Sequence, residues 1–143
     1  MSRRSNCRRA ALQVLYQDDL QPGGNPGISD AFIQTQLKQA DLIEFARDLV
    51  AGVRLYRKKL DEAITEVAEH WTLERMAATD RNVLRLGAFE ILHTETPNQV
   101  VVNEAVDLAK RFGTTDSGSF VNGILDKLMH ASKTDAAKTD SPK

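Results

Sequence analysis

Nine large apolar residues between Leu42 and Trp71 repeat at the spacing of an α-helix. The intervals are 3, 4, 4, 3, 4, 4, 3 and 4 residues, so eight steps cover 29 residues and average about 3.6. The pattern predicts one long helix, or two nearly collinear helices with a kink near Gly52. Asp41 followed by Glu44 resembles a capping box at its start. The residues of this stripe are Leu42, Phe45, Leu49, Val53, Tyr56, Leu60, Ile64, Val67 and Trp71.

Helical periods fill most of the remaining sequence, and convincing strand alternation appears nowhere. The predicted fold class is therefore all-α, with six or seven helices and short connections. The helix after Thr79 is apolar on most faces, so we expect it to be central and buried. Gly113 is expected to end a helix in the left-handed conformation. The other predicted helix starts are Ser5, Ser29 or Asp30, Pro97 and Asp116.

The length of 143 residues predicts one domain, over residues 1–130. Residues 131–143 contain no large apolar side chain and repeat the string KTD, so we expect a disordered tail.

Neither a signal peptide nor a membrane-spanning segment is apparent, which predicts a cytoplasmic protein. The single Cys7 has no partner for an internal disulfide.

The net charge of −1 conceals a basic N-terminus. Four of the 19 basic residues lie in the first nine positions, where there is no acid, which leaves 15 basic against 20 acidic residues, or −5, for the rest. Such an asymmetry favours a directed contact with a polyanion. At helical spacing Arg4 and Arg8 should share an exposed arc, while Arg9 points about 100° away. The four residues, here called the N-terminal arginine cluster, are Arg3, Arg4, Arg8 and Arg9.

Four ordered blocks of the chain resemble the NusB family of bacterial transcription antitermination factors. They lie between about Arg8 and Leu128, with a variable stretch over residues 21–39. The blocks read RRAALQVLY from Arg8, DRNVLRLGAFEIL from Asp80, VNEAVDLAKRFG from Val102 and FVNGILDKL from Phe120. The resemblance implies two small helical bundles in one domain, and no enzymatic activity.

By this resemblance the chain would bind boxA-type single-stranded RNA in nascent ribosomal RNA leaders together with NusE, a ribosomal protein that also acts in antitermination. It would join the RNA polymerase antitermination complex and help the polymerase read through terminators. No cofactor and no membrane partner are expected, and the choice between monomer and homodimer stays open. Two alternatives remain: a helical protein-interaction module, and a domain related to the NusB-like part of RNA cytosine methyltransferases.

The predicted RNA-binding residues come from three places. The N-terminal arginine cluster supplies charge, and Tyr16 closes the same helix. The turn between the last two helices adds two cations, followed by backbone amides at a helix N-terminus, which favour an anion. In that turn Asp116 is either only a helix N-cap or also a charge beside the RNA. The residues of this turn are Lys110, Arg111, Thr114, Asp116 and Ser117.

A second predicted contact, with NusE, lies at the start of the buried helix. Acids there also stabilise the helix dipole, which is the simpler explanation from sequence. The resemblance places Asp80 on the surface that meets NusE, and an acidic contact fits a basic partner. The residues assigned to this contact are Glu74, Asp80, Arg81 and Asn82. A further basic run, 57–59, reads as a solvated helix face.

No catalytic or metal-binding constellation can be identified. The three histidines, His70, His93 and His130, lie on different predicted helices without a metal-binding motif. The glycine-rich loop over residues 23–27 lacks the Lys-Ser/Thr pair of a phosphate-binding loop. We therefore predict that the chain is not an enzyme and holds no metal.

Overall fold

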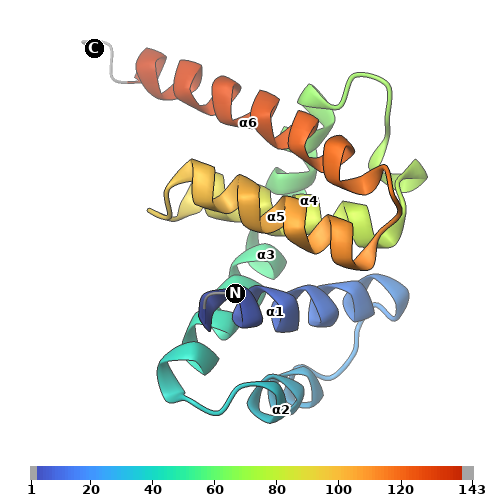
Figure 1. Ribbon diagram of the computed structural model, residues 1–143, viewed down its shortest axis with the longest axis vertical. Coiled ribbons are helices and arrows are strands. Elements are labelled where there is room, and N and C mark those ends of the chain that lie inside the picture. Colours follow the sequence, from blue (N-terminus) through green and yellow to red (C-terminus); the bar gives the residue numbers. More distant parts are fainter. Residues whose placement is uncertain (1–2, 140–143) are drawn as a thin grey trace. The chain divides into compact units, whose positions relative to one another are not determined.

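The computed structural model describes residues 3–139, and all of its regular elements are helices (Figure 1). Six α-helices and one short 3-10 helix agree with the six or seven predicted. In chain order they are α1 (Arg3–Leu20), α2 (Pro26–Gln36), α3 (Ala40–Val67), η1 (Leu73–Arg75), α4 (Ala78–His93), α5 (Asn98–Phe112) and α6 (Ser117–Thr139). The all-α prediction is confirmed.

The chain forms two compact units, divided between Arg57 and Lys58 inside α3. The first unit holds α1, α2 and the beginning of α3, and the second holds the end of α3 and the elements after it. This division agrees with the two small bundles that were expected. The assignment of residues 1–130 to one domain remains a prediction.

Helix α3 is one continuous helix, without the break considered near Gly52. It ends at Val67, so the prediction that it reaches Trp71 is wrong. Trp71 is 46% exposed and its ring meets Phe120 of α6 edge to face, with 5.6 Å between the ring centroids. The helical spacing of Trp71 therefore reflects packing against another helix and not continuation of α3.

Three helices begin before their predicted starts, and the first is α1, which begins at Arg3 and not at Ser5. Helix α2 begins at Pro26, with Asn25 as N-cap, and the Asn25 side chain accepts a hydrogen bond from the amide of Gly27. Proline favours this first helical position because it has no N–H to leave unpaired. Helix α4 begins at Ala78, before the expected cap Thr79. The guanidinium of Arg81, which donates to the carbonyls of Leu73 and Met76, fixes the chain as it enters α4.

Helix α6 continues to Thr139, beyond the end at residue 130 that we predicted. Alanine and lysine are good helix formers, and the next proline is Pro142, so nothing in the sequence stops the helix at 130. Residues 140–143 of the predicted tail lie outside the described residues.

Helix α4 is the centre of the second unit, as predicted, with α5 and α6 packed along it (Figure 1). Ten consecutive residues, from Asn82 to Ile91, are buried. Gly87 permits a close approach, since a Cβ atom there would lie 2.8 Å from Cδ1 of Leu125 and 3.7 Å from the Cβ of Ala105. The absence of a side chain at Gly87 therefore lets three helices meet.

The same substitution at two helical glycines should have opposite effects on stability. At Gly87 a methyl group would push against the fully buried Leu125, so Gly87→Ala should lower the free energy of unfolding by about 1–3 kcal/mol. At Gly123 nothing lies within 4 Å of the added carbon, so Gly123→Ala should raise it by about 0.5–1 kcal/mol. Urea denaturation of both variants checks this. Equal effects would contradict the close packing at Gly87.

Candidate nucleic-acid interface

The N-terminal arginine cluster lies in the first two turns of α1, which begins at Arg3. Arg3 is exposed, and it donates to the side-chain oxygen of Gln39 and to Oδ2 of Asp41 at 3.4 Å. Arg4 is also exposed, and its Cζ lies 4.4 Å from the centre of the Phe45 ring. The first turn of α1 is therefore attached to the start of α3 by side chains, instead of forming a flexible arm.

Arg8 differs from the others because it is only 3% exposed. The prediction that it shares an exposed arc with Arg4 is therefore wrong. Arg8 lies on the buried stripe of α1 that continues through Leu12 and Leu15, where the aliphatic part of an arginine can pack like an apolar side chain. Its guanidinium carbon lies 5.3 Å from the centre of the Phe45 ring. Arg9 is partly exposed.

Cys7 lies between these arginines and is fully buried. Its Sγ is 3.3 Å from the carbonyl oxygen of Leu42, so the thiol can donate a hydrogen bond to α3. Burial, the largest cause, raises the pKa of the thiol above its usual value, although Arg8 and Arg4 act in the opposite direction. Cys7 is therefore a packed thiol and not a reactive thiolate.

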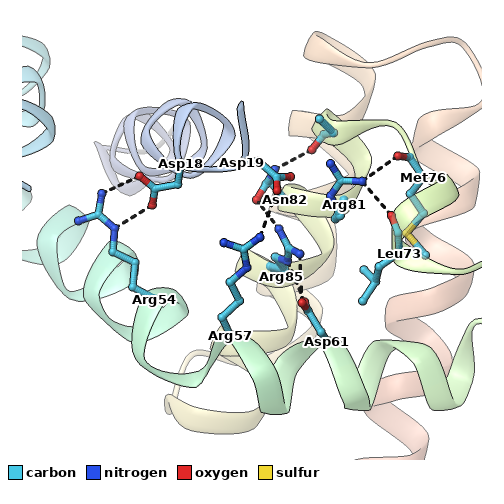
Figure 2. A network of polar contacts seen from close by, with 11 residues as sticks. Asp18, Asp19, Arg54, Arg57, Asp61, Leu73, Met76, Arg81, Asn82 and Arg85 are labelled. Carbon is cyan, nitrogen blue, oxygen red and sulfur yellow. Dashed lines mark hydrogen bonds and ion pairs between the residues drawn. The ribbon is translucent and has the colours of Figure 1, made fainter. Parts of the chain in front are cut away.

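The other end of α1 carries acids, and these are paired. Asp18 accepts two hydrogen bonds from Arg54 of α3, at 2.8 and 2.9 Å, and Asp19 accepts one from Arg57 at 3.1 Å (Figure 2). Tyr16 lies two residues before Asp18 and is 37% exposed. The charge along α1 is therefore divided, with cations at its beginning and carboxylates held by arginines at its end.

The turn between α5 and α6 places Lys110 and Arg111 in the last turn of α5, both exposed. Cations at a helix C-terminus interact favourably with the helix dipole, so their position also serves local stability. The aliphatic part of Lys110 lies over Gly118, where a Cβ atom would come within 2.9 Å of its Cγ. Thr114 and Asp116 are exposed and follow directly.

Ser117, and not Asp116, makes the hydrogen bonds that close this turn. The Oγ of Ser117 accepts a hydrogen bond from the amide of Thr114 at 2.9 Å, and Ser117 is 1% exposed. Asp116 does precede α6, as predicted, but among the described residues its carboxylate caps no amide. Because Ser117 is buried, it cannot be part of an exposed surface in this conformation.

Gly113 does not adopt the expected left-handed conformation, since its φ is −100° and its ψ −153°. The reason for glycine at this position is the lack of room for a side chain. A Cβ atom would lie 2.4 Å from the Oγ of Ser117 and 2.7 Å from the carbonyl oxygen of Ala109. The tight approach of Ser117 to the end of α5 therefore requires a residue without a side chain.

The four residues predicted to meet a protein partner divide into exposed and internal ones. Glu74 in η1 is exposed, and Asp80 is partly exposed in the first turn of α4. Asn82 is 1% exposed and donates to the carbonyl of Ala78, while Arg81 holds two carbonyls of the preceding segment (Figure 2). Arg81 and Asn82 therefore organise the start of α4, and Glu74 and Asp80 are the side chains that a partner could reach.

One side-chain atom in this region is an exception to the rule that buried polar atoms are paired. Oδ1 of Asp80 is buried without a hydrogen-bond partner among the described residues.

Trp71, in the segment between α3 and η1, is exposed, and the guanidinium carbon of Arg75 lies 5.9 Å from the centre of its ring. Sequence reasoning missed the exposure of Trp71, because its spacing matches that of a buried stripe.

The described part of the chain contains no group of three or more His, Cys, Asp or Glu side chains that could hold a metal ion. No helix within it is long and apolar enough to cross a membrane.

Comparison with known proteins identifies the family. The model of the NusB family matches residues 5–130. This chain belongs to the NusB family. A protein of Anaeromyxobacter dehalogenans named transcription antitermination protein NusB is 45% identical over 128 residues, which are 89% of this chain and 90% of that protein. The NusB of Symbiobacterium thermophilum is 43% identical, covering 93% of this chain and 92% of its own length.

Solved NusB structures have the same fold. The NusB of T. maritima has a TM-score of 0.80 and 33% identity, covering 91% of this chain and 92% of that one. A NusB solved with NusE and double-stranded RNA has a TM-score of 0.82 and 31% identity, covering 92% and 98%. The resemblance drawn from the four sequence blocks is confirmed, as is the prediction that the chain is not an enzyme, because relatives of this family are named antitermination proteins.

The hydrogen bonds of the turn predict which residue stabilises it. Ser117→Ala removes the oxygen that accepts from the Thr114 amide, and we expect it to lower the free energy of unfolding by about 1–2 kcal/mol. Asp116→Ala should change it by less than about 0.5 kcal/mol. Thermal and urea denaturation measure both. A larger loss for Asp116→Ala than for Ser117→Ala would mean that Asp116 is the cap after all.

Proposed function

We propose that this protein is a transcription antitermination factor that binds boxA-type single-stranded RNA in nascent ribosomal RNA leaders together with NusE. It acts by recruitment. RNA and NusE each bind it weakly, and binding of one raises the effective concentration of the other, so the affinity of the whole complex is higher than that of either pair. The complex then helps RNA polymerase pass terminators.

The observation that carries this proposal is the position of the N-terminal arginine cluster. Four arginines occupy the first two turns of α1, where the helix dipole is already positive and no acid is present. Cations at that end weaken a helix, so local stability does not explain them. Their charges and the positive end of the helix dipole together attract anions, as a phosphate backbone requires.

The relatives support the choice of partners. The NusB solved with NusE and RNA covers nearly the whole of this chain at the same fold. Its RNA is double-stranded, whereas exposed arginines and Tyr16 are side chains suited to unpaired bases. We place RNA on the three arginines of the cluster that are not buried, Arg3, Arg4 and Arg9. We also place it on Tyr16 and on the turn formed by Lys110, Arg111, Thr114 and Asp116, and we place NusE on Glu74 and Asp80.

A protein-interaction module that never contacts nucleic acid is the second candidate. The exposed Trp71 with its neighbour Arg75 favours it, because aromatic and arginine side chains are enriched in protein interfaces. The two candidates differ in one measurement, the dependence of RNA affinity on salt.

Charge removal at the exposed arginines should flatten the salt dependence. Each phosphate neutralised on single-stranded RNA contributes about 0.7 to the slope of log affinity against log salt, so replacing Arg3, Arg4 and Arg9 by Ala should reduce the slope by about 2. Four arginines would give about 3, but Arg8 is buried and we leave it out. Fluorescence titration of a labelled boxA-type RNA with NusE present, at several salt concentrations, measures the slope.

A matched control removes three other cations, Lys58, Lys59 and Lys127, which are exposed and lie outside the proposed site. This variant should keep the slope of the unaltered protein. Equal changes in the two triple variants would mean that net charge alone drives binding. A slope that does not change when Arg3, Arg4 and Arg9 are removed would exclude these arginines from the RNA site.

Asp116 provides a separate test of the RNA path. Since its carboxylate caps no amide in the described structure, Asp116→Asn deletes a charge without removing a helix cap. If RNA passes this turn, the variant should bind more tightly at low salt because repulsion is reduced, and the gain should shrink as salt rises. Unchanged affinity at low salt, with an unchanged melting temperature, would place the RNA elsewhere.

A further inference from the structure

Two guanidinium groups of α1 lie near one aromatic ring of α3. The Cζ atoms of Arg4 and Arg8 are 4.4 and 5.3 Å from the centre of the Phe45 ring, both within the range of a cation–π contact. Arg8 is buried, and Arg4 is exposed. Phe45 is therefore the point at which an exposed arginine of the predicted RNA site meets the packed interior of its unit.

The contact of Arg4 differs in kind from those of three other exposed or partly exposed arginines in this unit, Arg3, Arg47 and Arg54. Arg47 and Arg54 each donate two hydrogen bonds to a carboxylate, and Arg3 pairs with Asp41. A carboxylate partner occupies the N–H groups of a guanidinium and offsets its charge. An aromatic ring occupies only one flat face, so the N–H groups at the edge stay available for phosphate.

The segment that carries Arg4 is held on both sides. Arg3 contacts Gln39 and Asp41, and the Cys7 thiol reaches the carbonyl of Leu42. An arginine that is already placed loses less rotamer freedom when it binds, so more of its interaction appears as affinity. The beginning of α3 therefore acts as a support for the beginning of α1.

We propose that Phe45 is a positioning residue for Arg4, and that one unpaired nucleobase of the RNA stacks on the guanidinium face opposite the ring. The base, the guanidinium and the phenyl ring then form three parallel layers, since guanidinium groups stack on aromatic planes and unpaired bases stack on arginine. The inference rests on the proposed RNA binding and adds the recognition of a base to the recognition of phosphate.

The first test separates ring from charge. Phe45→Leu keeps an apolar side chain and every charge, so the affinity for labelled boxA-type RNA with NusE should fall about fivefold to tenfold while the salt slope stays unchanged. Phe45→Tyr keeps the ring and should bind nearly as well as the unaltered protein. Phe32→Leu is the matched control for the loss of a phenyl group in the same unit, and it should not change the affinity.

The second test locates the base. Nucleosides of the RNA are replaced one at a time by an abasic residue, which keeps the phosphate and removes the base. In the unaltered protein one position should cost about tenfold in affinity, and in Phe45→Leu and in Arg4→Lys that same position should cost much less. Arg4→Lys keeps the charge but not the plane, and because Arg4 is exposed it should fold normally even where Phe45→Leu does not.

The outcomes are distinct. If the abasic costs are the same in the unaltered protein and in Arg4→Lys at every position, no base stacks on Arg4 and the inference is wrong, although RNA binding stands. If Phe45→Leu and Phe32→Leu weaken binding equally, Phe45 has only a structural role. If the unaltered protein with NusE does not bind the RNA, the proposed function itself fails.

Discussion

The second unit depends on the burial of α4, and that burial depends on how the helix pairs its polar groups. Arg85 is 4% exposed, and its guanidinium donates to both carboxylate oxygens of Asp61, at 2.8 and 3.0 Å, and to Oδ1 of Asn82 at 3.3 Å (Figure 2). Asp61 is partly exposed, whereas Arg85 is buried, so removing Asp61 would leave a buried charge without compensation. The pair therefore fixes where the end of α3 lies against α4, and Gly87 then allows α5 and α6 to pack closely around the same helix.

In the first unit, the charges at the beginning of α1 are unfavourable for the helix itself. Cations there oppose the helix dipole, and the helix is kept by packing instead of by its own local preferences. Cys7 and Arg8 are buried, and Arg3 and Arg4 contact the start of α3. The cations at this helix end oppose the local rule of stability, and the contacts of Arg3, Arg4 and Cys7 with the start of α3 compensate for that.

The fold class could be predicted from the sequence because the spacing of apolar residues, and the four blocks that resemble the NusB family, reflect how the interior packs. The sequence predicted the all-α class and the buried α4 correctly. It failed where a side chain's partner lies far away in the chain: Trp71 has the period of α3 but packs on Phe120. Arg8 has the period of the buried stripe through Leu12 and Leu15, but its charge led to the prediction that it is exposed. The predicted N-cap of α2 was wrong for a local reason, since Asn25, Ser29 and Asp30 could each serve as the cap. Helix α4 begins after Ala77, which makes no side-chain cap hydrogen bond. Packing does not explain why residue 123 is glycine, because a Cβ atom added there would have nothing within 4 Å.

The candidate site shows why counting charges in a sequence overestimates an electrostatic surface. The four arginines at the beginning of α1 are chemically identical, yet their surroundings differ. Arg8 is buried, Arg3 shares its charge with Asp41, Arg4 rests on a ring that leaves its hydrogen-bond donors available, and Arg9 is partly exposed. Among these four, Arg4 combines an available charge with a side chain placed against a ring. Affinity for a polyanion depends on the number of available charges, whereas discrimination among bases requires a flat group held in place. The division of labour among these arginines is therefore set by α3, through Asp41 and Phe45, and not by α1, which carries them.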